Sequence, residues 1–136
     1  MKLNLLQSLN YTKIDGFDTI NDIDIMKNGE FLICYEVNPK QGCNIEPEKE
    51  LFLENMMFAG KKSVSSASPV TLPAGYYLFV QSRGDAPLNR DEWLDMAIEQ
   101  QKDGLWERDK PENYLYIRFL FEDGKYVTQV FRPVAC

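Results

Sequence analysis

The hydrophobic positions of the segment 72–104 change their period halfway along it. Residues 76–81 (YYLFVQ) alternate between two faces, which predicts a strand. Residues 89–102 (NRDEWLDMAIEQQK) repeat at helical spacing, which predicts a helix. The two faces of the strand carry Tyr76, Leu78 and Val80, and Tyr77, Phe79 and Gln81. The segment therefore predicts a strand that leads into a helix.

The predicted helix carries signals for its own start and end. Asn89 is placed as the N-cap, and Glu92 completes a capping-box pair with it. Gly104 is placed where a helix stops. One stripe of the helix is largely apolar and is expected to pack on a sheet. Its members are Trp93, Leu94, Ala97, Ile98 and Gln101.

Residues 113–134 predict a β-hairpin, because Asp123-Gly124 is a preferred pair for a two-residue type I′ turn. The opposing pairs in this register are Phe121–Tyr126, Phe119–Thr128, Arg118–Gln129 and Tyr116–Phe131. The more apolar face should meet the helix and carries Leu115, Ile117, Phe119, Phe121, Tyr126, Thr128 and Val130. The opposite face carries Tyr114, Tyr116, Arg118, Leu120, Val127, Gln129 and Phe131.

The first half of the chain has a weaker pattern. Residues 29–38 (GEFLICYEVN) alternate as a strand, with Phe31, Ile33, Tyr35 and Val37 facing one way and Leu32, Cys34 and Glu36 the other. For 49–59 we favour a strand over a helix, because its start alternates and its neighbours are strands. Residues 63–69 are either a loop or the beginning of the next strand. The first 28 residues predict at most one short helix, around Leu3–Leu9.

These elements predict one α+β domain over residues 1–136, with a predominantly antiparallel sheet and one main helix packed on it. We divide it into a short N-terminal segment (1–28), the first-half strands (29–70) and a strand–helix–strand–strand unit (71–136). A chain of 136 residues is long enough to bury a core of its own.

Charge and composition exclude several classes of function. The chain has 21 acidic and 15 basic residues, and a net charge of -6 argues against non-specific binding to nucleic acid or anionic membranes. It has no His, which excludes Ser-His and Cys-His dyads and a His-ligated zinc. The three cysteines Cys34, Cys43 and Cys136 form no CxxC pair and suit a reducing compartment. With no apolar run typical of a signal peptide or membrane span, we expect a cytoplasmic protein without a metal or cofactor.

The motifs LICYEVNP, LPAGYYLFVQSRG, YLYIRFLFE and VTQVFRPV, together with their order, resemble the GyrI-like effector-binding domains of AraC- and MerR-type regulators. The resemblance covers residues 29–134. It implies two pseudo-symmetric strand–helix–strand–strand units, with a small-molecule ligand in the cleft between them against aromatic side chains and often a carboxylate. The first unit is too short here for a helix of its own, and no helix-turn-helix fits before Gly29. A reduced, stand-alone binding module is therefore expected.

The candidate ligand surface is the sheet face opposite the helix. On it, aromatic walls stand beside a few polar groups, as small-molecule pockets require. Arg118 can bind a carboxylate or phosphate in two-point fashion, and Gln129 can orient it. An alternative is that this face packs against the first half of the chain or a second subunit, with Arg118 bonded to a buried acid. The residues of this face are Tyr77, Phe79, Gln81, Tyr116, Arg118, Gln129 and Phe131.

Three further residues are candidates for ligand contact. The Glu36 carboxylate, beside Tyr35, can attract a cation assisted by aromatic faces, although it can also be a solvent-facing strand residue or neutralise Arg118. Trp106 follows the helix and is either a lid over the pocket or a packed plug.

The expected function is binding of a small aromatic or amphipathic molecule, without catalysis, nucleic acid or membrane. A protein-interaction or homodimerisation module that uses the same face is the alternative. A hydrolase is a third interpretation. It requires an acid/base pair, made by Tyr35 or Tyr116 with Glu36 or Glu112.

Overall fold

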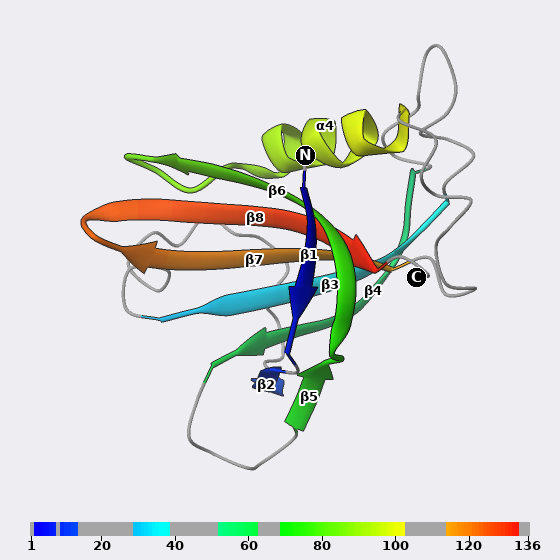
Figure 1. Cartoon of the computed structure of the whole chain (residues 1–136), viewed down its shortest axis with the longest axis horizontal. Helices are drawn as coiled ribbons and strands as arrows, with labels where there is room; N and C mark the ends of the chain where they lie inside the picture. The colour runs from blue at the N-terminus through cyan, green and yellow to red at the C-terminus, as the bar shows by residue number, and fades with distance from the viewer. Residues whose placement is uncertain are drawn as a thin grey trace.

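The computed structural model of the chain describes residues 2–7, 9–13, 29–38, 52–62, 69–102 and 114–133. These residues form strands and one helix, so the fold is α+β with strands dominating (Figure 1). The elements are β1 Lys2–Leu6, β2 Leu9–Lys13, β3 Phe31–Val37, β4 Leu53–Lys61, β5 Pro69–Leu72, β6 Gly75–Gly84, α4 Arg90–Lys102, β7 Tyr114–Glu122 and β8 Lys125–Pro133.

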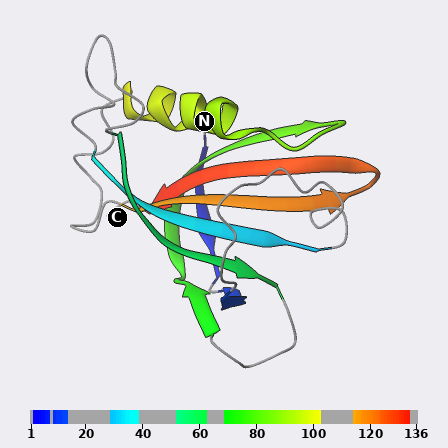
Figure 2. The ribbon, with the colours of Figure 1, turned by 180° about the vertical axis from the view of Figure 1, so that it is seen from behind.

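The strands make one eight-stranded sheet in the order β1-β6-β8-β7-β3-β4-β2-β5. Every pairing between neighbours is antiparallel. The sheet curls into a half-barrel, with α4 lying along its outside (Figures 1 and 2). The expectation of a predominantly antiparallel sheet with one main helix on it is thus confirmed for the described residues.

The predicted hairpin forms in the expected register. β7 and β8 pair through Arg118 opposite Gln129 and through Tyr116 opposite Phe131. At the turn, Asp123 has φ 53° and Gly124 has φ 76°, the left-handed values that a type I′ turn requires at both central positions. The turn therefore decides which side chains of the hairpin face the helix.

The prediction of a short helix around Leu3–Leu9 is wrong. Residues 2–6 and 9–13 are the strands β1 and β2 instead. β1 pairs with β6, and β2 pairs with β5 and with the end of β4. The edges of β6 and β5 offer backbone groups that need hydrogen-bond partners. That long-range pairing outweighs the weak local preference of a leucine-rich segment.

Four strands, β1, β2, β5 and β6, form one bent ribbon through two pairings. β1 lies against β6 from Lys2 opposite Phe79 to Leu6 opposite Gly75. β2 lies against β5, beginning with Leu9 opposite Leu72. This pairing continues the register of β1 with β6 without a shift. One end of the ribbon joins the sheet at β8 through β6, and the other joins β4 through β2. The ribbon therefore links both sides of the curled sheet.

The helix starts as predicted. Asn89 Oδ1 accepts a hydrogen bond from the Glu92 backbone N–H at 2.9 Å, and Glu92 Oε1 accepts one from the Asn89 N–H at 3.1 Å. This is the reciprocal capping box. The predicted stop at Gly104 and the side chain of Gln101 lie outside the described residues.

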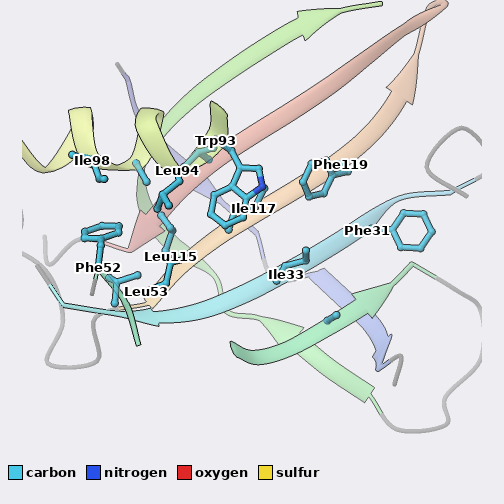
Figure 3. Packing of buried hydrophobic residues seen from close by; sticks show 14 residues of the cluster. Phe31, Ile33, Phe52, Leu53, Trp93, Leu94, Ile98, Leu115, Ile117 and Phe119 are labelled. Carbon is cyan, nitrogen blue, oxygen red and sulfur yellow. The ribbon is translucent and has the colours of Figure 1, made fainter. Parts of the chain in front are cut away.

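Apolar side chains of α4 cover one face of the sheet, which we call the outer face. Trp93, Leu94 and Ile98 are buried against Ile117 and Leu115 (Figure 3). The other buried members of this cluster are Phe31, Ile33, Val37, Phe52, Leu53, Ala59, Ala97, Phe119 and Val130. The favoured strand over 49–59 is confirmed as β4 from Leu53 onwards.

Gly60 lies where the β2 strand of the ribbon pairs with β4. A substitution there tests how tightly the ribbon packs on the sheet. A Cβ there would meet Tyr11 Cβ at 2.8 Å and Val70 Cγ2 at 3.1 Å. We expect Gly60→Ala to lower the free energy of unfolding by about 1–3 kcal/mol, as overpacking does. Gly84→Ala is the matched control, because a Cβ there meets nothing within 4 Å. Urea denaturation of both variants makes the comparison, and equal stabilities would contradict a tight crossing.

Candidate functional site

The face of the sheet opposite α4, which we call the inner face, has a hydrophobic cluster of its own. Tyr77, Tyr116 and Phe131 are buried there with Leu32 and Cys34 of β3. The ribbon contributes Tyr11 and Leu72, which are buried in the same cluster. The aromatic face predicted as a ligand surface is therefore covered in large part by the ribbon.

Side chains of the inner face lie in rows that run across neighbouring strands, because opposite residues share a face. Two rows bear on function. The polar row consists of Gly60, Leu32, Arg118, Gln129 and Gln81, each opposite the next. The aromatic row consists of Phe58, Cys34, Tyr116, Phe131 and Phe79, in the same strand order.

Rings of the inner face contact one another closely. Tyr116 stacks on Phe131 with centroids 5.6 Å apart and planes at 14°. Tyr77 meets Phe131 edge-on at 5.5 Å. The Tyr77 hydroxyl donates a hydrogen bond to the Pro73 carbonyl at 2.5 Å, at the bend between β5 and β6. Of the rings in the aromatic row, Phe79 and Phe58 are only half-buried.

A continuous chain of polar contacts joins Arg118, Gln129 and Gln81 of the polar row. It continues beyond the row to Glu30 and Tyr11. Arg118 Nη2 lies 3.0 Å from Glu30 Oε1, and Arg118 Nη1 donates to Gln129 Oε1 at 3.2 Å. Gln129 Nε2 then donates to Gln81 Oε1 at 3.0 Å. At the other end, the Tyr11 hydroxyl donates to Glu30 Oε2 at 2.7 Å. Five side chains from five different segments are thereby held in one arrangement.

The side chains at the centre of these polar contacts are largely buried but still reach solvent. The side chains of Arg118 and Glu30 are 18% and 17% exposed, and Gln81 is exposed. Burial, and then the bond to Glu30, raise the pKa of Tyr11 well above its usual value. Tyr11 therefore stays protonated and donates. Arg118 Nε is buried and has no hydrogen-bond partner among the described residues.

The remaining candidates are not brought together with Arg118. Glu36 is on the inner face, but its Oε1 accepts from Asn55 Nδ2 at 3.2 Å, and its side chain does not neutralise Arg118. Tyr35 is on the outer face, with its ring 5.6 Å from that of Trp93. Tyr35 and Glu36 thus point to opposite faces. Trp106 and Glu112 lie outside the described residues.

Two residues of the site were missed by sequence reasoning, Glu30 and Tyr11. Glu30 could have been placed on the inner face from the alternation of β3, because positions 30, 32, 34 and 36 share one face. The role of Tyr11 had no such signal, since it depends on the pairing of β2 with β5.

The arrangement is suited to holding a polar group beside aromatic rings. Within the described ranges, no group of three or more His, Cys, Asp or Glu is placed to hold a metal ion. In the same part of the chain, no helix has the length and apolar character needed to cross a bilayer. What remains is a cation, amides and a carboxylate next to half-buried aromatic side chains.

Arg118 and Glu30 should be strongly coupled in stability. We expect a double-mutant cycle with Arg118→Met and Glu30→Gln to give a coupling of about 1–3 kcal/mol, because either single change removes the nearest opposite charge from a shielded side chain. The control cycle uses Arg83→Met and Glu122→Gln, whose side chains are 40% and 54% exposed. Its coupling should stay below about 1 kcal/mol. Similar couplings in the two cycles, measured in urea, would refute a structural role for the inner pair.

Cys34 should be chemically silent in the folded protein. Burial raises the pKa of its thiol to about 12, and its side chain is 1% exposed. At pH 8 the reactive thiolate is then on the order of one part in ten thousand. Iodoacetamide should modify Cys34 only after unfolding, as followed by mass spectrometry of its peptide. Rapid modification of the native protein would show that the aromatic row is open.

Two comparisons of the sequence with known proteins gave no match. No protein-family model matches the chain, and no curated protein matches its sequence. Similarity to the GyrI-like domains thus rests on the sequence motifs alone.

Proposed function

We propose that the protein is a stand-alone module that binds a small, partly aromatic or amphipathic molecule at the polar row, without catalysis. The observation that carries this proposal is the chain from Glu30 through Arg118 and Gln129 to Gln81, fixed by hydrogen bonds yet accessible to solvent at Arg118 and Gln81. Preorganised polar groups beside apolar rings are the usual composition of a small-molecule site.

The polar chain has capacity left for a ligand. Each terminal nitrogen of Arg118 carries two N–H groups, and Glu30 and Gln129 each contact one of these nitrogens. Gln81 accepts a bond through its oxygen, which leaves its exposed amide N–H groups to donate. The neighbouring Phe79 offers a half-buried ring for the apolar part of a ligand.

The resemblance to GyrI-like modules supports the same proposal, because that family binds small molecules against aromatic side chains. The free, buried thiol of Cys34 suits the reducing cytoplasm that we propose as the location.

A protein-interaction or homodimerisation module is the second candidate, and its support comes from another surface. The exposed large hydrophobic residues of the described segments are Leu5, Tyr76, Met56 and Met57. Leu5 lies opposite Tyr76 in the pairing of β1 with β6, and the two methionines lie on β4. Large apolar side chains exposed opposite one another, as Leu5 and Tyr76 are, occur at contact surfaces. This candidate thus uses a different surface from the predicted aromatic face.

A thermal-shift screen of metabolites and lipophilic drugs tests the proposal. At about 100 times Kd, a ligand adds about 2.7 kcal/mol, which raises the Tm by several degrees. The shift should vanish in Arg118→Ala and persist in Glu36→Ala, each compared with its own ligand-free Tm, because only Arg118 belongs to the polar chain.

Gln81→Ala serves as a milder variant, since Gln81 is exposed and sits at the end of the chain of contacts. It should reduce the ligand shift with little loss of stability. A screen without hits, together with a dimer on a sizing column that Met57→Glu dissociates, would replace the small-molecule site with the interaction module.

A further inference from the structure

The polar row ends in a basic surface, although the chain as a whole is acidic. The net charge is -6. Yet on the inner face, near the crossing of β2, β3 and β4, two cations share one carboxylate. They are Arg118 and Lys62, and the carboxylate is that of Glu30. Lys13 is on β2, which pairs with β4 next to them.

Two of these cations are held by contacts with Glu30. Its Oε1 faces Arg118, and its Oε2 lies 3.9 Å from Lys62 Nζ. The Lys62 backbone N–H donates to the Glu30 carbonyl at 2.8 Å, which places the lysine beside the start of β3. One carboxylate cannot neutralise both charges, so among the described residues the positive charge is in excess at this point.

Lys13 extends the polar row on its far side. It lies opposite Gly60, and Gly60 lies opposite Leu32, the neighbour of Arg118 in the row. Alternation along β2 puts Lys13 on the face of Tyr11, which is buried in the inner cluster. The space over Gly60 is filled by Tyr11 and Val70, so Lys13 lies beyond them at the edge of the row.

The other acidic side chains of the described inner face contact residues outside this cluster. Glu36 bonds to Asn55. Glu122, at the end of β7, lies 3.5 Å from Arg83. The excess positive charge at the Lys62 end is therefore not compensated along the inner face of the described strands.

We propose that this end of the polar row binds the anionic group, a carboxylate or a phosphate, of the small molecule. This inference rests on the proposed function and specifies the charge of its ligand. Lys62 and Lys13 supply ammonium donors, and Arg118, oriented by Glu30 and Gln129, supplies the fixed charge. Glu30 keeps the cluster stable when no anion is bound.

The test uses simple probes that differ in charge. Phenyl phosphate and benzoate represent the anions, and benzyl alcohol and benzylamine are their neutral and cationic counterparts. Isothermal titration calorimetry of the wild type should detect the two anions and neither counterpart. Affinity for the anions should fall as the salt concentration rises.

Lys62→Gln and Lys61→Gln form the matched pair of variants. They remove the same charge from adjacent positions, but Lys61 lies opposite Phe31, a residue of the outer-face cluster. We expect Lys62→Gln to weaken phenyl phosphate binding about fivefold, the effect of one charge-assisted contact. Lys61→Gln should leave it unchanged.

The possible outcomes distinguish failure of the anion site from failure of the proposed binding function. Binding of benzyl alcohol or benzylamine alone, lost in Gln81→Ala, would overturn the anionic ligand and keep the proposed binding module. Equal weakening by the two lysine variants would show attraction by overall charge and would also overturn the anion site. If none of the probes binds and the metabolite screen has no hits either, both the anion site and the binding function fail.

Discussion

The two-sided sheet is the constraint on which the rest of this structure depends. β3, β6, β7 and β8 carry large apolar side chains on both faces, and α4 covers only one of them. The other face needs a cover of its own, because exposing a set of rings such as Tyr77, Tyr116 and Phe131 to water would cost several kcal/mol. The bent ribbon provides that cover through Tyr11 and Leu72. Curling of the sheet is thus the way in which a chain with one described helix buries two apolar faces.

Local signals were enough to predict the elements that make their own contacts nearby. The Asp123-Gly124 turn determines the β7–β8 register, and Asn89 caps α4 within its own first turn. The strands at residues 2–13 could not be predicted in this way, because their partners lie at 69–79 and a leucine-rich segment reads equally as helix or strand.

The same distinction between local and distant contacts applies to the candidate site. The pairing of Arg118 with Gln129 followed from the turn, and the inward direction of Gln81 followed from alternation. The carboxylate that holds Arg118 was foreseen as a type of partner but not as Glu30, since β3 and β7 are joined by no short turn that would reveal their register. In the fold, Glu30 makes Arg118 rigid, and a rigid cation loses less entropy when it binds.

The ribbon also determines the order in which the chain can fold. Lys2 pairs with Phe79, so β1 depends on a partner that is distant in the sequence. Contacts this distant form slowly. Until they form, the inner-face rings lack part of their cover and can associate with other chains. The yield of folded protein therefore depends on how quickly β1 and β2 reach β6 and β5.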